Sequence, residues 1–179
     1  MGTTTPLILV RHGESEWNDR NLFAGWADVD LTARGIAQAV RAGELLREHG
    51  ELPDVAHTSL LRRSVLTGSV VLHGTGRAWV PVHRSWRLNE RHYGALQGRD
   101  KADVRAEYGE EQFRLWRRSY EGLPPPLSGP EQRLIDADPR YRGLCGAIPA
   151  AESLRDVGTR LLPHYQDAIG ADLRAGRRV

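Results

Sequence analysis

The sequence has few of the features that cross-link a small protein by disulfides, anchor it in a membrane or bind a structural metal. Cys145 is the only cysteine among 179 residues, so no disulfide can form within this sequence. No Cys or Cys/His cluster suggests a structural metal. No apolar run approaches the length of about 20 residues that a membrane-spanning helix needs. The N-terminal MGTTTP lacks the basic and apolar regions of a targeting signal, so we expect a cytoplasmic protein.

Lysine is also nearly absent. Lys101 is the only one, and arginine carries almost all of the positive charge. The formal net charge is only +2, and basic and acidic residues are interspersed, without the basic stripe that is typical of nucleic-acid binding. Anionic small molecules and ordinary solvated faces remain as explanations for the arginines. The length and a hydrophobic content of 40% fit a single domain over residues 1–179.

Hydrophobic periodicity predicts alternating strands and helices. Expected strands or extended stretches are residues 7–10, 54–59 and 78–86, with Pro81 placing the third at an edge of the sheet or at the end of a strand. Expected helices are residues 32–50, 60–72, 101–109, 110–120 and one from Glu152 that is kinked or interrupted at Pro163. Thr32 is the expected N-cap of the first helix, whose apolar face would consist of Ile36, Ala39, Val40, Gly43, Leu45 and Leu46. LPPPLSGP and the segment to about Pro149 are expected to stay irregular. The pattern predicts an α/β fold, a three-layer arrangement with a mostly parallel sheet flanked by helices.

The stretch LILVRHGESEWN places His12 directly after the first expected strand. In open α/β sheets ligands bind beyond the carboxyl ends of strands, which is where this histidine would lie. A neutral imidazole is a good nucleophile toward phosphorus, and the guanidinium of Arg11 can hold a phosphoryl group by charge-assisted hydrogen bonds. Gly13 allows close approach of backbone and substrate. The alternative is a histidine that makes ordinary hydrogen bonds within a turn.

Several ordered motifs resemble one family over nearly the whole chain. They are RHGESEWN, LFAGWADVDLT, HTSLLRRSV, RLNERHYGALQG, FRLWRRSY and DPRY. Together they resemble the histidine phosphatase superfamily and, within it, the cofactor-dependent phosphoglycerate mutases. The resemblance implies a phosphoglycerate mutase-like fold, an isomerase activity in glycolysis and gluconeogenesis, 2,3-bisphosphoglycerate as the priming phosphoryl donor and no metal. It also implies homodimers or homotetramers.

The resemblance implies roles for four catalytic residues. His12 would accept the phosphoryl group, and Arg11 and Arg63 would clamp it, since such transfers depend mainly on positioning and charge stabilisation. Glu90 would move the proton between substrate hydroxyl and leaving oxygen. Without the resemblance, Arg63 would be interpreted as a solvated helix arginine beside Arg62, and Glu90 as an ion-pair partner of neighbouring arginines.

A further set of residues matches the family's substrate-binding positions. Ser15 and Asn18 would supply neutral hydrogen bonds, and the remainder would hold the carboxylate and the distal phosphate: Ala24, Gly25, Arg91, Tyr93, Lys101, Arg117 and Arg118. Ala24 stands where the family often has threonine, a change that removes a hydrogen bond worth about 1 kcal/mol. Taken alone, WRR is typical of a tryptophan and two arginines that pack along a helix. In a protein that also has a nucleophilic histidine, the arginines suit a mutase, because a mutase must retain a bisphosphorylated intermediate.

The resemblance also implies a second catalytic histidine, in HGNS after a strand that AGRRV would begin. The sequence stops at Val179, and no other histidine lies in a matching context. We therefore expect a domain that is incomplete at its C-terminus, lacking a strand and helices, with a rate of phosphoryl transfer lowered roughly a hundredfold or more. A truncated protein, an interrupted reading frame and a degenerate copy remain open.

Two alternatives to the mutase follow from this reasoning. One is a histidine-type phosphatase, which would release phosphate to water rather than pass it to phosphoglycerate. The other is a catalytically impaired relative that binds phosphorylated ligands through its arginines, without turnover.

Overall fold

A computed structural model describes residues 5–144 and 148–179 of the protein. Cys145, the single cysteine, lies outside the described residues, as does most of MGTTTP. The chain forms two compact units. The first unit comprises the residues up to Glu16 together with 28–88 and 161–179, and the second comprises 17–27 and 89–160.

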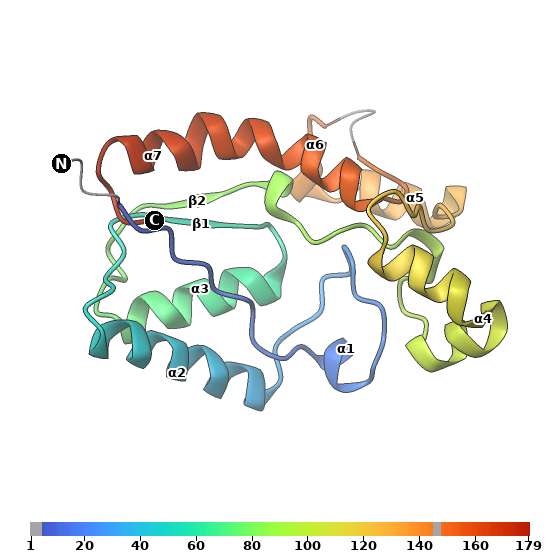
Figure 1. The fold of residues 1–179 in the computed structure, drawn as a ribbon, viewed down its shortest axis with the longest axis horizontal. Coiled ribbons are helices and arrows are strands. Elements are labelled where there is room, and N and C mark those ends of the chain that lie inside the picture. Colours follow the sequence, from blue (N-terminus) through green and yellow to red (C-terminus); the bar gives the residue numbers. More distant parts are fainter. Residues whose placement is uncertain (1–4, 145–147) are drawn as a thin grey trace. The chain divides into compact units, whose positions relative to one another are not determined.

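The first unit is built on a parallel pair of short strands, β1 (Ala56–Thr58) and β2 (Val82–Arg84), with His57 opposite His83 in the register. Helix α3 (Arg62–Gly74) connects them, as in a βαβ crossover. Helices α2 (Ala33–Glu48) and α3 cover one side of the pair and α7 (Gly170–Arg174) covers the other (Figure 1). The α/β class with a parallel sheet is therefore confirmed, and Pro81 directly precedes β2 as expected.

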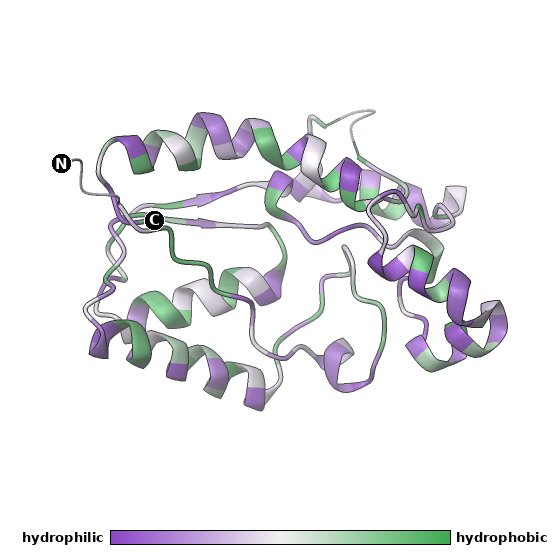
Figure 2. Cartoon of the chain, in the orientation of Figure 1, coloured by the Kyte–Doolittle hydropathy of each residue, from purple (hydrophilic) through white to green (hydrophobic). Residues whose placement is uncertain are grey.

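The apolar segment 7–10 is not a strand, contrary to the sequence-based prediction. This hydrophobic segment near the N-terminus is irregular (Figure 2), and Leu9 is 85% exposed. The N–H of Ile8 donates to the carbonyl of Val179, the last residue of the sequence, at 2.8 Å. A strand requires a ladder of such bonds, and this contact does not extend into one.

The two helices on one side of the sheet approach through glycine. A Cβ on Gly43 of α2 would lie 2.9 Å from the carbonyl oxygen of Val71 and 3.2 Å from the Cα of Gly74, both in α3. Thr32 caps α2 as predicted, accepting the N–H of Gly35. The predicted buried face is only partly correct, because close approach buries Gly35, Ala39 and Gly43. The larger Ile36, Val40 and Leu45, predicted on that face, are 45%, 42% and 40% exposed.

The first unit has its own small core of Val55, Ile169 and Val179, with Leu88 and Leu173 against it. Arg178 joins this region by backbone pairing, because its carbonyl accepts the N–H of Asp54 at 2.8 Å. The predicted beginning of a strand in AGRRV is thus seen as pairing of Arg178 and Val179 with neighbouring backbone, although no strand is formed.

The second unit packs around Phe23, Leu96, Val104, Phe113 and Trp116. Helix α4 (Lys101–Arg118) supplies three of these, and Asp100 caps it by accepting the N–H groups of residues 102 and 103. The predicted break at Gly109 is confirmed, since that residue has φ 81° within the helix. The short helix α1 (Glu16–Asp19) lies at the start of this unit's first segment, which begins at Trp17. The 3₁₀ turns Gly94–Leu96 and Pro139–Tyr141 belong to this unit, and the turn Trp86–Leu88 belongs to the first.

The segment after LPPPL is not irregular throughout, contrary to the prediction. Helix α5 (Gly129–Asp136) begins at a capping box in which Ser128 and Glu131 satisfy each other's backbone groups. The S-x-x-E spacing, with Pro130 in the first turn, is a signal for the start of a helix. The many prolines and glycines around it instead favoured the prediction of an irregular segment.

Helix α6 (Leu154–His164) begins close to the predicted Glu152. Pro163 lies inside it and lacks the N–H that an α-helix needs, and the chain continues as a π-type turn over Tyr165–Ile169 before α7. The α-helix therefore ends at His164, one residue after the predicted break at Pro163. Within the described residues, no helix has both the length and the hydropathy to cross a bilayer.

Candidate active site

The turn after the N-terminal segment is tied to helix α3 through a buried threonine. The N–H of Gly13 donates to Oγ1 of Thr67 at 3.1 Å, and this hydroxyl donates to the carbonyl of Arg63 at 2.7 Å. Thr67 is only 3% exposed. One hydroxyl thus joins the backbone beside His12 to the backbone of Arg63, 51 positions away in the sequence.

The same turn lies directly against the first turn of α2. A Cβ on Gly13 would lie 2.1 Å from the carbonyl oxygen of Gly35, and a Cβ on Gly35 would lie 2.0 Å from that of Glu14. Only glycine fits at both positions without moving the backbone. The glycine in RHG is therefore required by tight packing of the turn on the helix, besides any approach of substrate.

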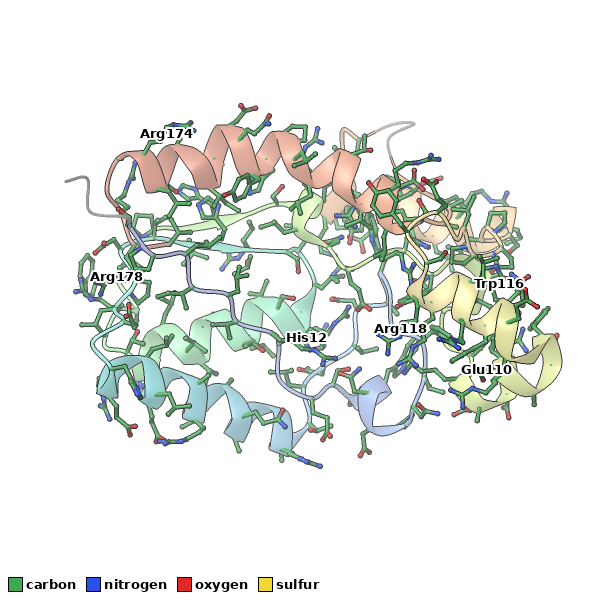
Figure 3. The ribbon with its side chains drawn as sticks, viewed as in Figure 1. His12, Glu110, Trp116, Arg118, Arg174 and Arg178 are labelled. Atoms are coloured by element: carbon green, nitrogen blue, oxygen red, sulfur yellow. The ribbon has the colours of Figure 1, made fainter. Side chains whose placement is uncertain are left out.

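His12 lies half-buried on this turn (Figure 3). Its Nδ1 is 2.7 Å from the carbonyl oxygen of Gly13, which can only accept, so Nδ1 carries the donated proton, and in the neutral ring the lone pair lies on Nε2. The turn hydrogen bond considered as an alternative therefore exists, and it selects the tautomer with a nucleophilic Nε2. His12 also lines a cavity of about 290 Å³, with Val10, Ser59, Thr67 and Gly68 among its other walls.

The two arginines that begin α3 have opposite surroundings. Arg63 is fully buried at 0% exposure, whereas the side chain of Arg62 is 55% exposed. The backbone N–H of Arg62 donates to Oδ1 of Asp28 at 2.7 Å, and its guanidinium lies 3.4 Å from the carboxylate of Asp30. Arg62 is therefore the arginine that faces water, and the alternative of a solvated Arg63 is wrong.

The remaining predicted residues of the first unit differ in exposure. Arg11 is exposed beside His12. Ser15 is fully buried, and its backbone forms an isolated antiparallel β-bridge with Leu31. Asn18 belongs to the second unit and accepts the N–H of Asn21 through its carbonyl. The first unit thus brings Arg11, His12, Ser15 and Arg63 onto one turn and the helix start attached to it.

In the second unit the loop at Ala24 and Gly25 is held against the segment that contains Glu90. The indole N–H of Trp26 donates to the carbonyl of Glu90 at 2.8 Å. Gly25 has φ 54°, and a Cβ there would lie 2.5 Å from Oε1 of Gln97 and 3.1 Å from the N of Tyr93. Glycine is needed here for both conformation and space, and the buried Ala24 beside it is small.

Arg91 is a buried cation with unused donors. It is 5% exposed, donates from Nη2 to the carbonyl of Arg117 at 3.0 Å and lies 4.7 Å from the ring centre of Tyr93. Its Nε and Nη1 are buried and have no hydrogen-bond partner in the described part of the chain. Buried donors of this kind are costly unless satisfied, so an anion is a suitable partner.

Lys101 adds a second cation to this cluster. Its Nζ donates to the carbonyl of Leu22 at 2.7 Å and lies 5.6 Å from the ring centre of Phe23. Burial lowers the pKa of Lys101, the positive charge of Arg117 lowers it further, and the carboxylates of Glu90 and Asp100 act in the opposite direction. Lys101 is therefore close enough to both Glu90 and Arg117 for their charges to act on its ammonium group.

The two arginines of the WRR motif lie apart. Arg117 is half-buried, with its guanidinium 5.6 Å from the ring centre of Phe113. Arg118 is exposed at the end of α4 (Figure 3) and lines a shallow pocket with Tyr108, Leu115 and Ser119. The second unit therefore gathers Glu90, Arg91, Tyr93, Lys101 and Arg117, but the contacts described do not join Arg118 to them.

Two residues for which the sequence predicted no role in the site contact the segment that contains Glu90. They are Glu152 and Arg160, at 2% and 6% exposure. The signal was present in AESLRDVGTR, because S-x-x-D at Ser153 and Asp156 starts a helix and Arg160 follows Glu152 by about two helical turns.

His92 lies in the same buried layer. Its Nδ1 accepts the N–H of Gly94 at 2.9 Å, and its ring centre lies 5.4 Å from that of Trp26. Burial, and then the positive charge of Arg160, lower the pKa of His92 to about 4. The ring is therefore neutral near pH 7, when its acceptor nitrogen is needed by Gly94.

Comparisons with known proteins agree with the motifs. The profile of the histidine phosphatase superfamily (branch 1) matches residues 7–172. A 2,3-bisphosphoglycerate-dependent phosphoglycerate mutase from Rhodococcus jostii is 57% identical over 177 residues, covering 99% of this chain and 70% of the relative. The enzyme of that name from Mycobacterium leprae is 58% identical over 178 residues, covering 99% and 72%.

Solved structures share the fold. That of a phosphoglycerate mutase from Bacillus anthracis superposes with a TM-score of 0.67 at 22% identity, covering 96% of this chain and 70% of that one. Because the family profile spans most of the chain and the relatives are well above half identical, the protein belongs to the histidine phosphatase superfamily, branch 1, within the family of 2,3-bisphosphoglycerate-dependent phosphoglycerate mutases.

Proposed function

We propose that the protein interconverts 2-phosphoglycerate and 3-phosphoglycerate through a phosphohistidine at His12, primed by 2,3-bisphosphoglycerate. The observation that supports this best is the tautomer of His12. Its Nδ1–H donates to Gly13, so in the neutral ring Nε2 is the nitrogen whose lone pair would attack phosphorus. Relatives named as mutases at 57–58% identity support the same activity and do not favour the phosphatase alternative.

In the proposed step, a bond forms between Nε2 and phosphorus while the bond from phosphorus to the donor's oxygen breaks. The equatorial oxygens of the transferring group carry negative charge, and Arg11 and Arg63 would neutralise it. Ser15 and Asn18 would add neutral hydrogen bonds. The buried Arg63, linked through Thr67 to the turn of His12, is held more rigidly than a solvated arginine would be.

Glu90 would supply the proton that the leaving oxygen needs and take one from the attacking hydroxyl in the reverse transfer. An alkoxide is a poor leaving group, so the P–O bond breaks readily only as the proton arrives. The electrostatic coupling of Glu90 to the Lys101 ammonium supports its placement among the groups that handle substrate.

The binding of the carboxylate and distal phosphate would fall to Ala24, Gly25, Arg91, Tyr93, Lys101, Arg117 and Arg118. The buried donors of Arg91 support an anion at this place. Two or more cations beyond the nucleophile suit a bisphosphorylated ligand better than a monophosphate. This feature favours mutase over simple phosphatase chemistry, and binding without turnover remains the third outcome of the test.

The test is transfer of labelled phosphate. The protein is incubated with 2,3-bisphosphoglycerate carrying ³²P, and acid-labile label is measured with and without added 3-phosphoglycerate. We expect label on the protein that is lost when His12 is replaced in His12→Asn, and that passes to phosphoglycerate. Release to water would indicate a phosphatase, and binding without label in a folded sample would contradict the proposal.

The proposal includes metal independence and assembly into homodimers or homotetramers, as the resemblance implies, and the cytoplasmic location expected from the N-terminal sequence. Activity that is unchanged by a chelator and a molar mass of two or four chains in light scattering would agree with it.

A further inference from the structure

A buried ion pair underlies the segment that contains Glu90. Nε of Arg160 donates to Oε1 of Glu152 at 2.6 Å, and Nη2 donates to Oε2 at 3.0 Å. The two side chains are 6% and 3% exposed. The hydrogen bonds between Ser153 and Asp156 begin α6 between them, which sets the position of Arg160 on the helix relative to Glu152.

Both members of the pair bind the backbone of residues 89–92. Nη2 of Arg160 donates to the carbonyls of Asn89 at 2.8 Å and Glu90 at 3.0 Å. Oε2 of Glu152 accepts the N–H of His92 at 2.8 Å, and the N–H of Glu152 donates to the carbonyl of His92 at 2.9 Å. The pair therefore holds the peptide groups on both sides of Glu90.

Stability alone is a weak explanation for such a pair. Burying two charges costs desolvation, and well-packed apolar residues of similar volume are often as stable or more so. Apolar side chains, however, could not bind three carbonyl and amide groups in fixed directions. A planar guanidinium that is hydrogen-bonded to a carboxylate has little freedom to move. The backbone that it binds is then also fixed, and a proton-transfer group requires such a fixed backbone to keep its carboxyl group in place.

We infer that Glu152 and Arg160 are positioning residues for Glu90, holding its backbone so that the carboxyl group meets the oxygen that gains or loses a proton. This inference rests on the proposed function, in which Glu90 moves that proton. It extends the set of residues required for proton transfer beyond those that contact substrate, because neither Glu152 nor Arg160 touches substrate in this scheme.

Arg160→Lys and Glu152→Gln test the inference. Lysine keeps the charge but cannot reach Glu152, Asn89 and Glu90 together, and glutamine keeps the acceptor for His92 while it removes the ion pair. Arg155→Lys is the matched control, because Arg155 is on the same helix, is 59% exposed and pairs with Glu121. Melting temperatures and circular dichroism report whether each variant is folded.

The readout is the rate of His12 phosphorylation from two donors. Breaking the P–O bond of 2,3-bisphosphoglycerate releases an alkoxide that needs a proton, whereas 4-nitrophenyl phosphate releases a stable phenolate that does not. We expect both variants to lose 10- to 100-fold with bisphosphoglycerate and less than 3-fold with the aryl ester, since misplacing a catalytic group by about 1 Å can cost a hundredfold. Arg155→Lys should change neither rate.

A double mutant separates this inference from the proposed function. In a Glu90→Gln background, adding Arg160→Lys should have no further effect, because the group being positioned is gone. If Glu90→Gln leaves the bisphosphoglycerate rate unchanged, the proposed function is wrong. If Glu90→Gln lowers that rate but Arg160→Lys leaves it unchanged, slows both donors equally or acts additively with Glu90→Gln, the positioning role is overturned.

Discussion

The hydroxyl of Thr67 accepts the N–H of Gly13 at 3.1 Å while it donates to the carbonyl of Arg63 at 2.7 Å. A buried donor without a partner costs about 1–3 kcal/mol. We therefore predict that Thr67→Val, which keeps the shape and removes the hydroxyl, lowers the free energy of unfolding by that amount. Thr67→Ser should retain most of the stability. Denaturant unfolding measures both, and equal midpoints for the two variants would show that the hydroxyl is unimportant.

The contact between the turn and α2 predicts opposite effects for two glycines. A Cβ on Gly35 would lie 2.0 Å from the carbonyl oxygen of Glu14, whereas a Cβ on Gly158 in α6 meets nothing within 4 Å. Gly35→Ala should destabilise the protein by about 1–3 kcal/mol through overpacking. Gly158→Ala should stabilise it by about 0.5–1 kcal/mol through helix propensity. Thermal unfolding distinguishes them, and a stable Gly35→Ala variant would contradict the packing.

The neutral, buried His92 predicts acid destabilisation between pH 6.5 and about 4. In this window the unfolded histidine binds a proton and the folded one does not, so the free energy of unfolding falls as the pH falls. A pKa lowered from 6.5 to about 4 is worth about 3 kcal/mol. His92→Asn, whose side-chain oxygen can replace Nδ1 as acceptor from Gly94, removes the titration.

Unfolding curves at pH 7 and pH 4.5 should therefore differ less in His92→Asn than in the unchanged protein. Other groups titrate in both proteins, so the comparison isolates His92. An identical pH dependence in the two proteins would count against a neutral His92.

The different burial of Arg62 and Arg63 predicts different effects on phosphoryl transfer. Under the proposed function, Arg63→Lys should slow phosphorylation of His12 about a hundredfold, because a point charge cannot reproduce two directed donors to the equatorial oxygens. Arg62→Lys, at an exposed position, should change the rate less than threefold. Labelling from bisphosphoglycerate measures both, with melting temperatures as the control for folding. Similar losses in the two variants would refute the distinction.

Local signals in the sequence determined a large part of the fold. Thr32 as a cap, Gly109 as a break and Pro163 as an interruption act within one or two turns of the chain, so a linear pattern is sufficient to locate them. The motifs likewise located the residues proposed for catalysis and binding. The start of α5 at Ser128 was also encoded locally, but the many prolines and glycines around it favoured an irregular interpretation.

What the sequence could not determine depends on partners distant along the chain. Segment 7–10 is apolar enough for a strand, yet strand formation requires a ladder with another segment, and hydropathy contains no information about that partner. Arg62 and Arg63 are identical in type and adjacent, and only packing decided that the second is buried. The tie from Arg160 to the carbonyl of Glu90 spans 70 positions, so only the tertiary structure could place an ion pair beneath the proposed proton-transfer residue.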